Sequence, residues 1–477
     1  MLKEGLIPIP HSGLRRNYLG FWHIAAQSVA NIAPSGTPAL VVPLVYGITG
    51  NGAWMAYIFA TVALLFVAAC INQFARRTVS PGSLYTFVAQ GIGPTWGVVS
   101  GWSMVIAYLI IGSSVLAGLA NYVTVLAHAF FRANFDFVLV AAALVVAGLI
   151  AWFVAYRDVK LSTQFMLATE LVSISVILIL AFIFYAHHGT LLDPAQLSFS
   201  GMSANSLRQA LVLAIFSFVG FESATALGHE AKNPTRFIPA SVLFTVIATG
   251  AYFVFTTYTL VLAFHGHQPT LDQSNAPLSV LAQIIGMPVL GLLVAVGIAI
   301  GFFACALACI TAGARVLFAM SRHGLFYEAA GTTHPTHSTP HVAVALASIA
   351  VLLLPLVMVL LKVPVLDVYG ILGTLGTLGV LFSYILVSIA APVYLRNRGE
   401  RYGLAVLVAV VSVLAMLVPV IGSVYPAPPA PYNYLPYIFL ALLAVGVARF
   451  LYLRSKRPEM ISAIQADLVR EIEELSA

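Results

Sequence analysis

Two runs of this chain place helix-breaking residues and polar groups inside otherwise apolar segments. The first covers residues 31–38 and contains Pro34, Gly36 and Pro38, while the second covers residues 217–223. Proline has no amide hydrogen and glycine loosens the backbone, so a helix that meets such a run is expected to break. At a break the last carbonyls and the next amides lose their helical partners and can bind charged groups. The predicted chemistry is therefore recognition of a small charged solute by backbone dipoles.

Two carboxylates also lie inside apolar segments, Glu170 and Glu222. An ionised carboxylate is costly within a bilayer, so each is a candidate functional group. We expect Glu170 or Glu222 to take up and release a proton during the working cycle. The alternative is a structural carboxyl group that is hydrogen-bonded to a neighbouring helix. Thr311 is a weaker candidate, as a cation ligand opposite the first break.

The elements that must position these groups are membrane helices. Hydrophobic residues form 61% of the 477 positions and charged residues only 8%, which excludes an ordinary soluble domain. Apolar runs near the length needed to cross a bilayer recur along the chain. We predict an all-α integral membrane protein with twelve transmembrane helices, at 20–46, 50–75, 95–127, 137–156, 161–186, 206–228, 238–264, 283–321, 341–361, 366–394, 402–421 and 434–454.

Three further segments complete the predicted organisation. Residues 80–94 are too polar to span and are expected to form an interfacial or re-entrant helix. Residues 458–477 alternate apolar and acidic positions at helical spacing and predict a cytoplasmic amphipathic helix. The first twenty residues carry charges without a short apolar region, so no cleavable signal peptide is expected. The transporter-like domain is thus expected over residues 1–457.

The basic residues predict the topology. With both termini in the cytoplasm, alternating crossings leave only Arg132, Arg208 and Lys362 outside. The cytoplasmic set is Lys3, Arg15, Arg16, Arg76, Arg77, Arg157, Lys160, Lys232, Arg236, Arg315, Arg322, Arg396, Arg398, Arg401, Arg449, Arg454, Lys456, Arg457 and Arg470. This uneven division follows the positive-inside rule and favours the cell membrane as the location of the protein.

The two breaks lie about 185 residues apart, which is the offset expected of an inverted repeat of five helices. The first repeat would cover 20–186 and the second 206–394, with two additional helices over 402–454. Helices 1 and 6 would both be unwound at mid-membrane. Amides at one break and carbonyls at the other match the two charges of an α-amino acid.

Four stretches resemble motifs of the amino acid-polyamine-organocation superfamily of secondary transporters. They are Gly220-Phe221-Glu222 with residues 230–239, residues 80–85 with the glycines that follow, residues 315–324 with Thr339-Pro340, and the break in the first helix. The resemblance spans most of residues 20–394. It implies a 5+5 inverted repeat plus two helices, a midplane site and alternating access coupled to protons, sodium or exchange.

The breaks and the resemblance together suggest the site residues. Ser35, Gly36 and Thr37 should offer amides and hydroxyls to a substrate anion. Carbonyls near Ile32, Phe216, Ser217 and Val219 should face its ammonium group. Phe221 and Tyr108 are candidates for walls or gates, with helix packing as the alternative. Several proton-coupled relatives carry a lysine close to the position of Glu170.

The predicted function is transport of amino acids, with polyamines or another organocation as the alternative substrate because Pro34 removes an amide from the first break. The expected partners are this small solute, a coupling ion, most simply H⁺, and the lipid bilayer, without nucleic acid. A membrane receptor that keeps a transporter fold is a separate alternative. The chain has no phosphate loop, nucleophile elbow or HExxH run, and its three cysteines lack metal-ligand spacing. No enzyme, cofactor or metal is therefore expected.

Overall fold

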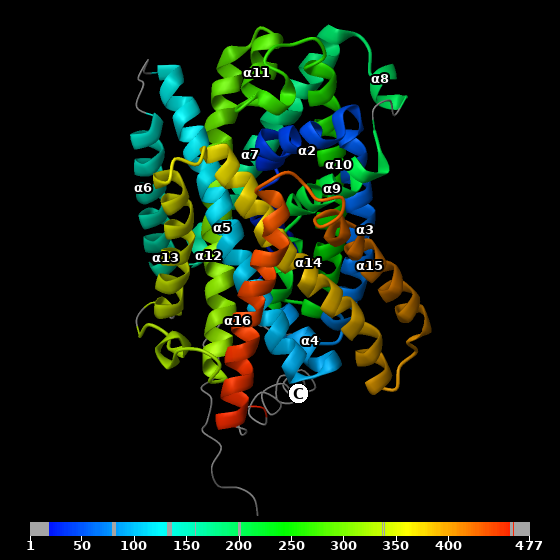
Figure 1. The fold of residues 1–477 in the computed structure, drawn as a ribbon, viewed down its shortest axis with the longest axis vertical. Coiled ribbons are helices and arrows are strands. Elements are labelled where there is room, and N and C mark those ends of the chain that lie inside the picture. The colour runs from blue at the N-terminus through cyan, green and yellow to red at the C-terminus, as the bar shows by residue number, and fades with distance from the viewer. Residues whose placement is uncertain are drawn as a thin grey trace, which may run out of the picture.

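The computed structural model describes residues 19–78, 83–130, 136–157, 159–198, 202–335, 337, 339–457 and 461. Within these ranges the long elements are all helices (Figure 1). The α-helices are α1 Phe21–Ile32, α2 Val42–Thr49, α3 Ala53–Ala75, α4 Leu84–Ile92, α5 Pro94–Phe130, α6 Asp136–Arg157, α7 Val159–His188, α8 Pro194–Leu197, α9 Ala204–Phe216, α10 Pro234–Ala263, α11 Pro277–Ile284, α12 Pro288–Arg322, α13 His341–Leu360, α14 Val365–Asn397, α15 Gly403–Gly422 and α16 Leu435–Lys456.

Short turns of other helical types join several of these helices. The π-helical turn is η1 Thr37–Val41, and the 3₁₀ turns are η2 Gly50–Gly52, η3 Phe221–Glu230, η4 Leu271–Gln273, η5 Glu328–Gly331 and η6 Tyr432–Tyr434. An isolated bridge pairs Leu19 with Ala231, and the Lys232 amide donates to the Leu19 carbonyl at 2.9 Å. The start of the chain's described part is thereby tied to the segment after η3.

In the described part of the chain, eleven helical segments are long and apolar enough to cross a membrane. The first runs from Phe21 to Ala75 and holds 55 residues. At a rise of about 1.5 Å per residue, a straight helix of that length would extend roughly 80 Å, far beyond a hydrocarbon core of about 30 Å. The segment is instead divided at η1 and η2. The protein therefore has the all-helical architecture of a multi-spanning membrane protein.

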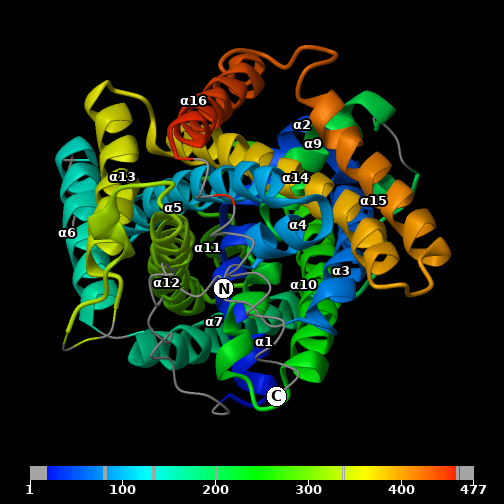
Figure 2. The same ribbon diagram turned by 90° about the horizontal axis from the view of Figure 1, so that it is seen from below.

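The helices form an inner group and an outer group. In the most apolar stretch of α5, 94% of the residues are buried. In the corresponding stretches of α6, α15 and α16, only 28% are buried. Seen from below, α6 and α13 lie on one side and α15 on the opposite side, with α5 and α14 running between them (Figure 2). The outer helices thus present apolar side chains to their surroundings, as lipid-facing helices do.

Small residues bring α5 and α14 together at the centre. A Cβ at Gly376 would lie 2.5 Å from Ile111, and one at Gly379 would lie 2.9 Å from the Ser103 carbonyl oxygen. The Ser103 hydroxyl donates to the Gly379 carbonyl at 2.8 Å. Close backbone approach at glycines, with hydroxyl groups as cross-links, is typical of packing between membrane helices.

Two predicted elements can be compared in detail with the structure. The predicted helix over 283–321 corresponds to α12, which begins five residues later at Pro288 because α11 ends at Ile284 and Gly286 takes a φ of 73°. The segment predicted over 80–94 as an interfacial or re-entrant helix contains α4, which is buried against α5 and α14. Gly91 allows this position, since a Cβ there would lie 2.6 Å from the Ala390 carbonyl oxygen.

Several expectations fall outside the described residues. They concern the predicted amphipathic helix over 458–477, of which only Ile461 is described, the charged residues Lys3, Arg15, Arg16, Arg132 and Arg470, and the motif residues 80–82.

Candidate functional site

The first helix stops inside the proline-rich run. α1 ends at Ile32, Ala33 takes a left-handed conformation with φ 48°, and regular helix resumes with η1 at Thr37. The Gly36 amide donates to the Ala33 carbonyl at 2.9 Å, and the Thr37 amide donates to the Pro34 carbonyl at 3.4 Å. The turn therefore satisfies two of the three amides that we expected to face a substrate anion.

The third amide of this turn is bound by Glu170. The Ser35 amide donates to Glu170 Oε1 at 2.6 Å, and the Ser35 hydroxyl donates to Oε2 at 3.1 Å. Glu170 lies on α7 and is 1% exposed, so its carboxyl group acts within the protein interior. All three amides are thus occupied by groups of the protein, which corrects the expectation that they are open to an anion.

The second break faces the first. α9 ends at Phe216, Gly220 takes a φ of 109°, and η3 begins at Phe221. A Cβ at Gly220 would lie 2.6 Å from Asn31 Nδ2, so only glycine permits this approach. α1 also contacts η3, because the Ser28 hydroxyl donates to the Phe221 carbonyl at 3.0 Å and accepts from the Ala224 amide at 3.1 Å. The two broken segments are therefore in direct contact.

Glu222 joins the second break to the central helices. Its Oε1 accepts from the Tyr108 hydroxyl at 2.9 Å, and its Oε2 accepts from the Tyr384 hydroxyl at 2.8 Å and the Gly220 amide at 3.2 Å. Tyr108 belongs to α5 and Tyr384 to α14. Three donors surround a carboxyl group that is 0% exposed, so the contact links three parts of the molecule through one side chain.

A small cavity lies between the two breaks. Six of the predicted site residues line it, namely Ile32, Gly36, Thr37, Phe216, Ser217 and Val219. The other lining residues are Asn31, Ala33, Val41, Ile111, Val115, Phe302, Cys305 and Tyr369. The structure thus brings residues from α1, η1, α5, α12, α14 and the end of α9 to one small space.

Six predicted residues lie outside this lining, and two of them are the carboxylates Glu170 and Glu222 described above. Ser35 turns toward Glu170, and Tyr108 turns toward Glu222. The Phe221 ring packs on the Tyr384 ring, with 5.4 Å between centroids. The Thr311 hydroxyl donates to the Leu307 carbonyl of its own helix at 2.9 Å.

The cavity is rich in hydrogen-bond acceptors. In the described residues, no amide donates to the carbonyls of Ile32, Ser217 or Val219, although the Phe216 carbonyl accepts from the Val219 amide at 3.2 Å. The Asn31 side-chain oxygen is also buried without a hydrogen-bond partner. Buried acceptors without donors are unfavourable, so they favour a ligand that brings N–H groups.

Aromatic rings and uncharged groups complete the lining. The Tyr369 ring lies 5.6 Å from the Phe216 ring and 5.8 Å from the Phe302 ring, measured between centroids. Among the described residues, the lining contains no Asp, Glu, Lys, Arg or His. Ring faces attract cations, as carbonyl oxygens do. The arrangement can therefore hold a small ammonium group without a charged side chain.

Sequence reasoning missed several of these residues. Asn31 lies in the first run and could have been included as a polar residue beside a break. Phe302, Cys305 and Tyr369 lie on α12 and α14 in apolar segments that offer no local signal. The Cys305 thiol donates to the Asn31 carbonyl at 3.1 Å, which is a contact between residues 274 positions apart. Such partners become visible only in the folded chain.

Comparison with known proteins agrees with this architecture. Residues 23–460 match the family model described as amino acid permease. The chain belongs to the amino acid permease family. The match includes both breaks, the cavity between them and the two buried carboxylates.

Three relatives illustrate the range of this permease family. The chain is 26% identical to the mouse cationic amino acid transporter 4, over 72% of this chain and 56% of the relative. It is 24% identical to the branched-chain amino acid permease of Bacillus subtilis, over 65% and 69%, and 28% identical to the low-affinity putrescine importer of Escherichia coli K12, over 64% and 67%. The match thus spans little more than half of the mouse protein. All three relatives are named as transporters rather than enzymes.

Proposed function

We propose that this permease-family chain is a secondary transporter that carries a small solute bearing an amino group across the cell membrane by alternating access. The cavity between the α1 and α9 breaks is the proposed binding site. The observation that carries the proposal is the set of carbonyls at Ile32, Ser217 and Val219 that have no amide donor in the described residues. An ammonium group would satisfy these oxygens and lie among aromatic rings.

Amino acids are the proposed substrates, in keeping with the family. In this binding mode the ammonium group meets the carbonyls of the breaks, while the carboxylate would meet the hydroxyl of Thr37, which lines the cavity. Aromatic and aliphatic residues such as Phe302 and Val115 would surround the rest of the solute. The names of two of the relatives, an amino acid transporter and an amino acid permease, support this choice.

A decarboxylated amine or polyamine is the second candidate. It is favoured by the occupied amides of Ser35, Gly36 and Thr37, because these amides would otherwise have held a carboxylate. The relative named as a putrescine importer supports it as well.

Matched pairs of solutes distinguish the two candidates. We would compare ornithine with putrescine, and leucine with isoamylamine, in thermal unfolding of the purified protein and in uptake by proteoliposomes. A ligand specific for the folded state raises the apparent stability by mass action. If the substrate is an amino acid, the amino acid of each pair should stabilise the protein and be taken up. If the substrate is an amine, the amine of each pair should do so. Stabilisation without uptake would favour the receptor alternative, and no response to either class would contradict the proposed site.

Two threonines supply a variant and its control. Thr37→Val removes a hydroxyl from the cavity at nearly constant volume, while Thr311→Val removes one that is bound within its own helix. We expect Thr37→Val to weaken the binding of an amino acid more than the binding of the corresponding amine. The difference should be about fivefold, the effect of one hydrogen bond. Thr311→Val should leave both affinities unchanged.

We also propose the arrangement of the chain in the membrane. The chain would cross the membrane twelve times, with repeats over 20–186 and 206–394 and two further helices over 402–454. The paired breaks would then occupy corresponding positions of an inverted repeat. Both termini would then lie in the cytoplasm, with residues 1–457 as one transporter domain and 458–477 as a cytoplasmic helix. Reporter fusions at the two ends test this topology, and opposite locations of the termini would contradict it.

Proton coupling through Glu170 or Glu222 completes the proposed function. Each carboxyl group is bound to a broken segment, Glu170 through Ser35 and Glu222 through Gly220. Protonation of either group would weaken hydrogen bonds that hold the break in its present conformation. A change in proton occupancy could thereby be linked to the shape of the cavity.

A further inference from the structure

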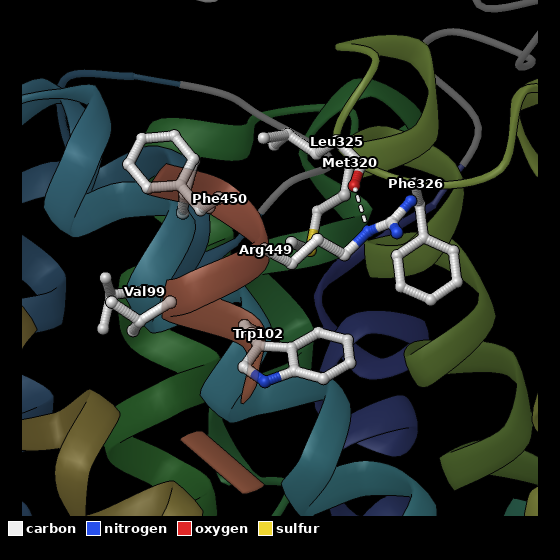
Figure 3. A pocket seen from close by; sticks show the side chains of 10 residues that line it. Val99, Trp102, Met320, Leu325, Phe326, Arg449 and Phe450 are labelled. Carbon is white, nitrogen blue, oxygen red and sulfur yellow. Dashed lines mark hydrogen bonds between the residues drawn. The ribbon is translucent and has the colours of Figure 1, made fainter. Parts of the chain in front are cut away.

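A second cavity lies away from the breaks, where α16 packs against α5 and the end of α12 (Figure 3). α5 contributes Val98, Val99 and Trp102, α12 and the loop after it contribute Met320, Leu325 and Phe326, and α16 contributes Gly446, Val447, Arg449 and Phe450. Every lining residue except Arg449 is apolar, aromatic or glycine.

The wall formed by Trp102 is fixed by its contacts with α16. The Trp102 indole donates to the Leu442 carbonyl at 3.0 Å. A Cβ at Gly446 would lie 2.0 Å from the indole ring, so glycine lets α16 rest directly on it. The indole N–H is therefore already satisfied, and Arg449 is the lining residue that can offer hydrogen bonds to an incoming group.

Arg449 extends across this cavity in Figure 3, with its guanidinium group beside Phe326. Its Nε donates to the Leu325 carbonyl at 3.4 Å, and its Cζ lies 5.6 Å from the Phe326 ring centroid. The residue is exposed, and in the described part of the chain it has no carboxylate partner. Among the described residues, Arg449 is thus a cation without a paired carboxylate at the edge of an apolar cavity.

The surroundings indicate which anion would fit. α16 is an outer helix with exposed apolar residues such as Leu440, Val445 and Leu451, as expected of a helix that faces lipid. Two more cations, Arg454 and Lys456, follow on the same helix, and Arg457 caps it. Basic pockets between membrane helices are suited to the headgroups of anionic lipids.

We propose that this cavity binds an anionic phospholipid, with the phosphate on Arg449 and part of one acyl chain against Val99, Val447 and Phe450. The headgroup carries the charge that Arg449 lacks, and the chain fills apolar space that water would occupy unfavourably. The bound lipid would connect α16 to α5 and to the end of α12. This site is separate from the cavity between the breaks, and it does not depend on the solute that is transported.

Lipid titrations of the delipidated full-length protein in detergent test the proposal. The probes are dioleoyl phosphatidylglycerol, dioleoyl phosphatidylcholine and inorganic phosphate, with thermal unfolding and native mass spectrometry as readouts. We expect phosphatidylglycerol to stabilise the wild type more than phosphatidylcholine does. We also expect the wild type to retain phosphatidylglycerol in preference to phosphatidylcholine. Equal stabilisation by inorganic phosphate would show an anion site rather than a lipid site and would overturn the proposal.

The variants separate this site from general attraction to a basic surface. Arg449→Gln should weaken phosphatidylglycerol binding by about fivefold, the effect of one cation near an anionic surface, while Arg449→Lys should retain part of the preference. Arg454→Gln is the matched control on the same helix, and because Arg454 does not line the cavity it should lose less of the preference than Arg449→Gln. Val447→Trp fills the cavity and should weaken the binding of both lipids. The unfolding temperature of this variant without lipid is the check that it folds. The proposal fails if Arg449→Gln keeps the wild-type preference or if Arg454→Gln loses as much.

Discussion

Gly301 of α12 packs against the carboxyl group of Glu170, so that a Cβ at position 301 would lie 2.7 Å from Oε2. The same Cβ would lie 2.9 Å from the Ser35 hydroxyl oxygen. Three segments therefore meet at one point, α12 at Gly301, α7 at Glu170 and the first break at Ser35. The glycine leaves room for the pair of hydrogen bonds that holds the turn.

Gly301→Ala should separate Ser35 from Glu170. The added methyl group displaces the carboxyl group or the hydroxyl, and the loss of a hydrogen bond to a buried charged group costs about 1.5–3 kcal/mol. Thermal unfolding in detergent measures the effect. Gly403→Ala, at the start of α15 with open space around it, is the control and should be neutral or slightly stabilising. Equal stability of both variants would show that the contact at Gly301 is loose.

Glu170→Gln should destabilise the first break and, under the proposed coupling, abolish transport driven by a pH gradient. The amide side chain can accept one of the two Ser35 donors, but its N–H₂ group then faces the other. We expect a loss of about 1–3 kcal/mol in stability. Glu328→Gln, whose carboxylate is 86% exposed, is the matched control. Vesicles with Glu170→Gln that still concentrate solute in response to a pH gradient would rule out this residue as the proton site.

Glu222 and Tyr384 should be energetically coupled. Their hydrogen bond of 2.8 Å is buried, so Tyr384→Phe and Glu222→Gln each remove part of the same contact. A double-mutant cycle on unfolding free energy should give a coupling of about 0.5–3 kcal/mol. The corresponding cycle with Tyr384→Phe and the distant Glu328→Gln should be additive. Additivity in both cycles would show that the contact contributes nothing beyond packing.

Gly220→Ala should impair both stability and solute binding. Its φ of 109° disfavours any side chain, and the new methyl group would meet Asn31 beside the cavity. Gly266→Ala is a suitable control, because its φ of 74° carries a similar backbone cost with no atom within 4 Å. We expect Gly266→Ala to lose about 1 kcal/mol and Gly220→Ala roughly 1–3 kcal/mol more. Unchanged solute binding in a folded Gly220→Ala protein would contradict the contact between the breaks.

The ion pairs of Glu400 predict a small dependence of stability on pH. Hydrogen bonds from Arg77, at 2.8 Å, and from Arg398, at 3.1 Å, hold the pKa of the Glu400 carboxyl below its usual range. A lowered pKa contributes stability that is present above the unfolded value of about 4.3 and is lost as the pH falls through the folded value. Because the side chain is 35% exposed, the contribution should stay within about 1 kcal/mol.

Unfolding of wild type and Glu400→Gln at pH 7 and at pH 3.5 measures this contribution. The two proteins should differ at pH 7 and converge at the lower pH. A difference that persists unchanged at pH 3.5 would assign the effect to packing instead of charge.

The sequence by itself determined the class of the protein and the position of its irregular segments. Membrane helices follow from composition, since apolar runs of this length have few other stable solutions. Proline and glycine interrupt a helix close to their own positions in the chain. Accordingly, α1 ends at Ile32 and α9 ends at Phe216, where the two runs with these residues were found. The predicted carboxylates Glu170 and Glu222 are indeed buried.

Only the tertiary structure decided which groups satisfy one another. Ser35 and Glu170 are 135 positions apart, and neither has a local feature that selects the other. The same holds for Cys305 and Asn31, and for the burial of α4. Hydrogen bonds and packing between distant segments depend on which faces the helices present to each other. For this reason the amides expected to bind an anion are occupied, while carbonyls and aromatic rings line the cavity.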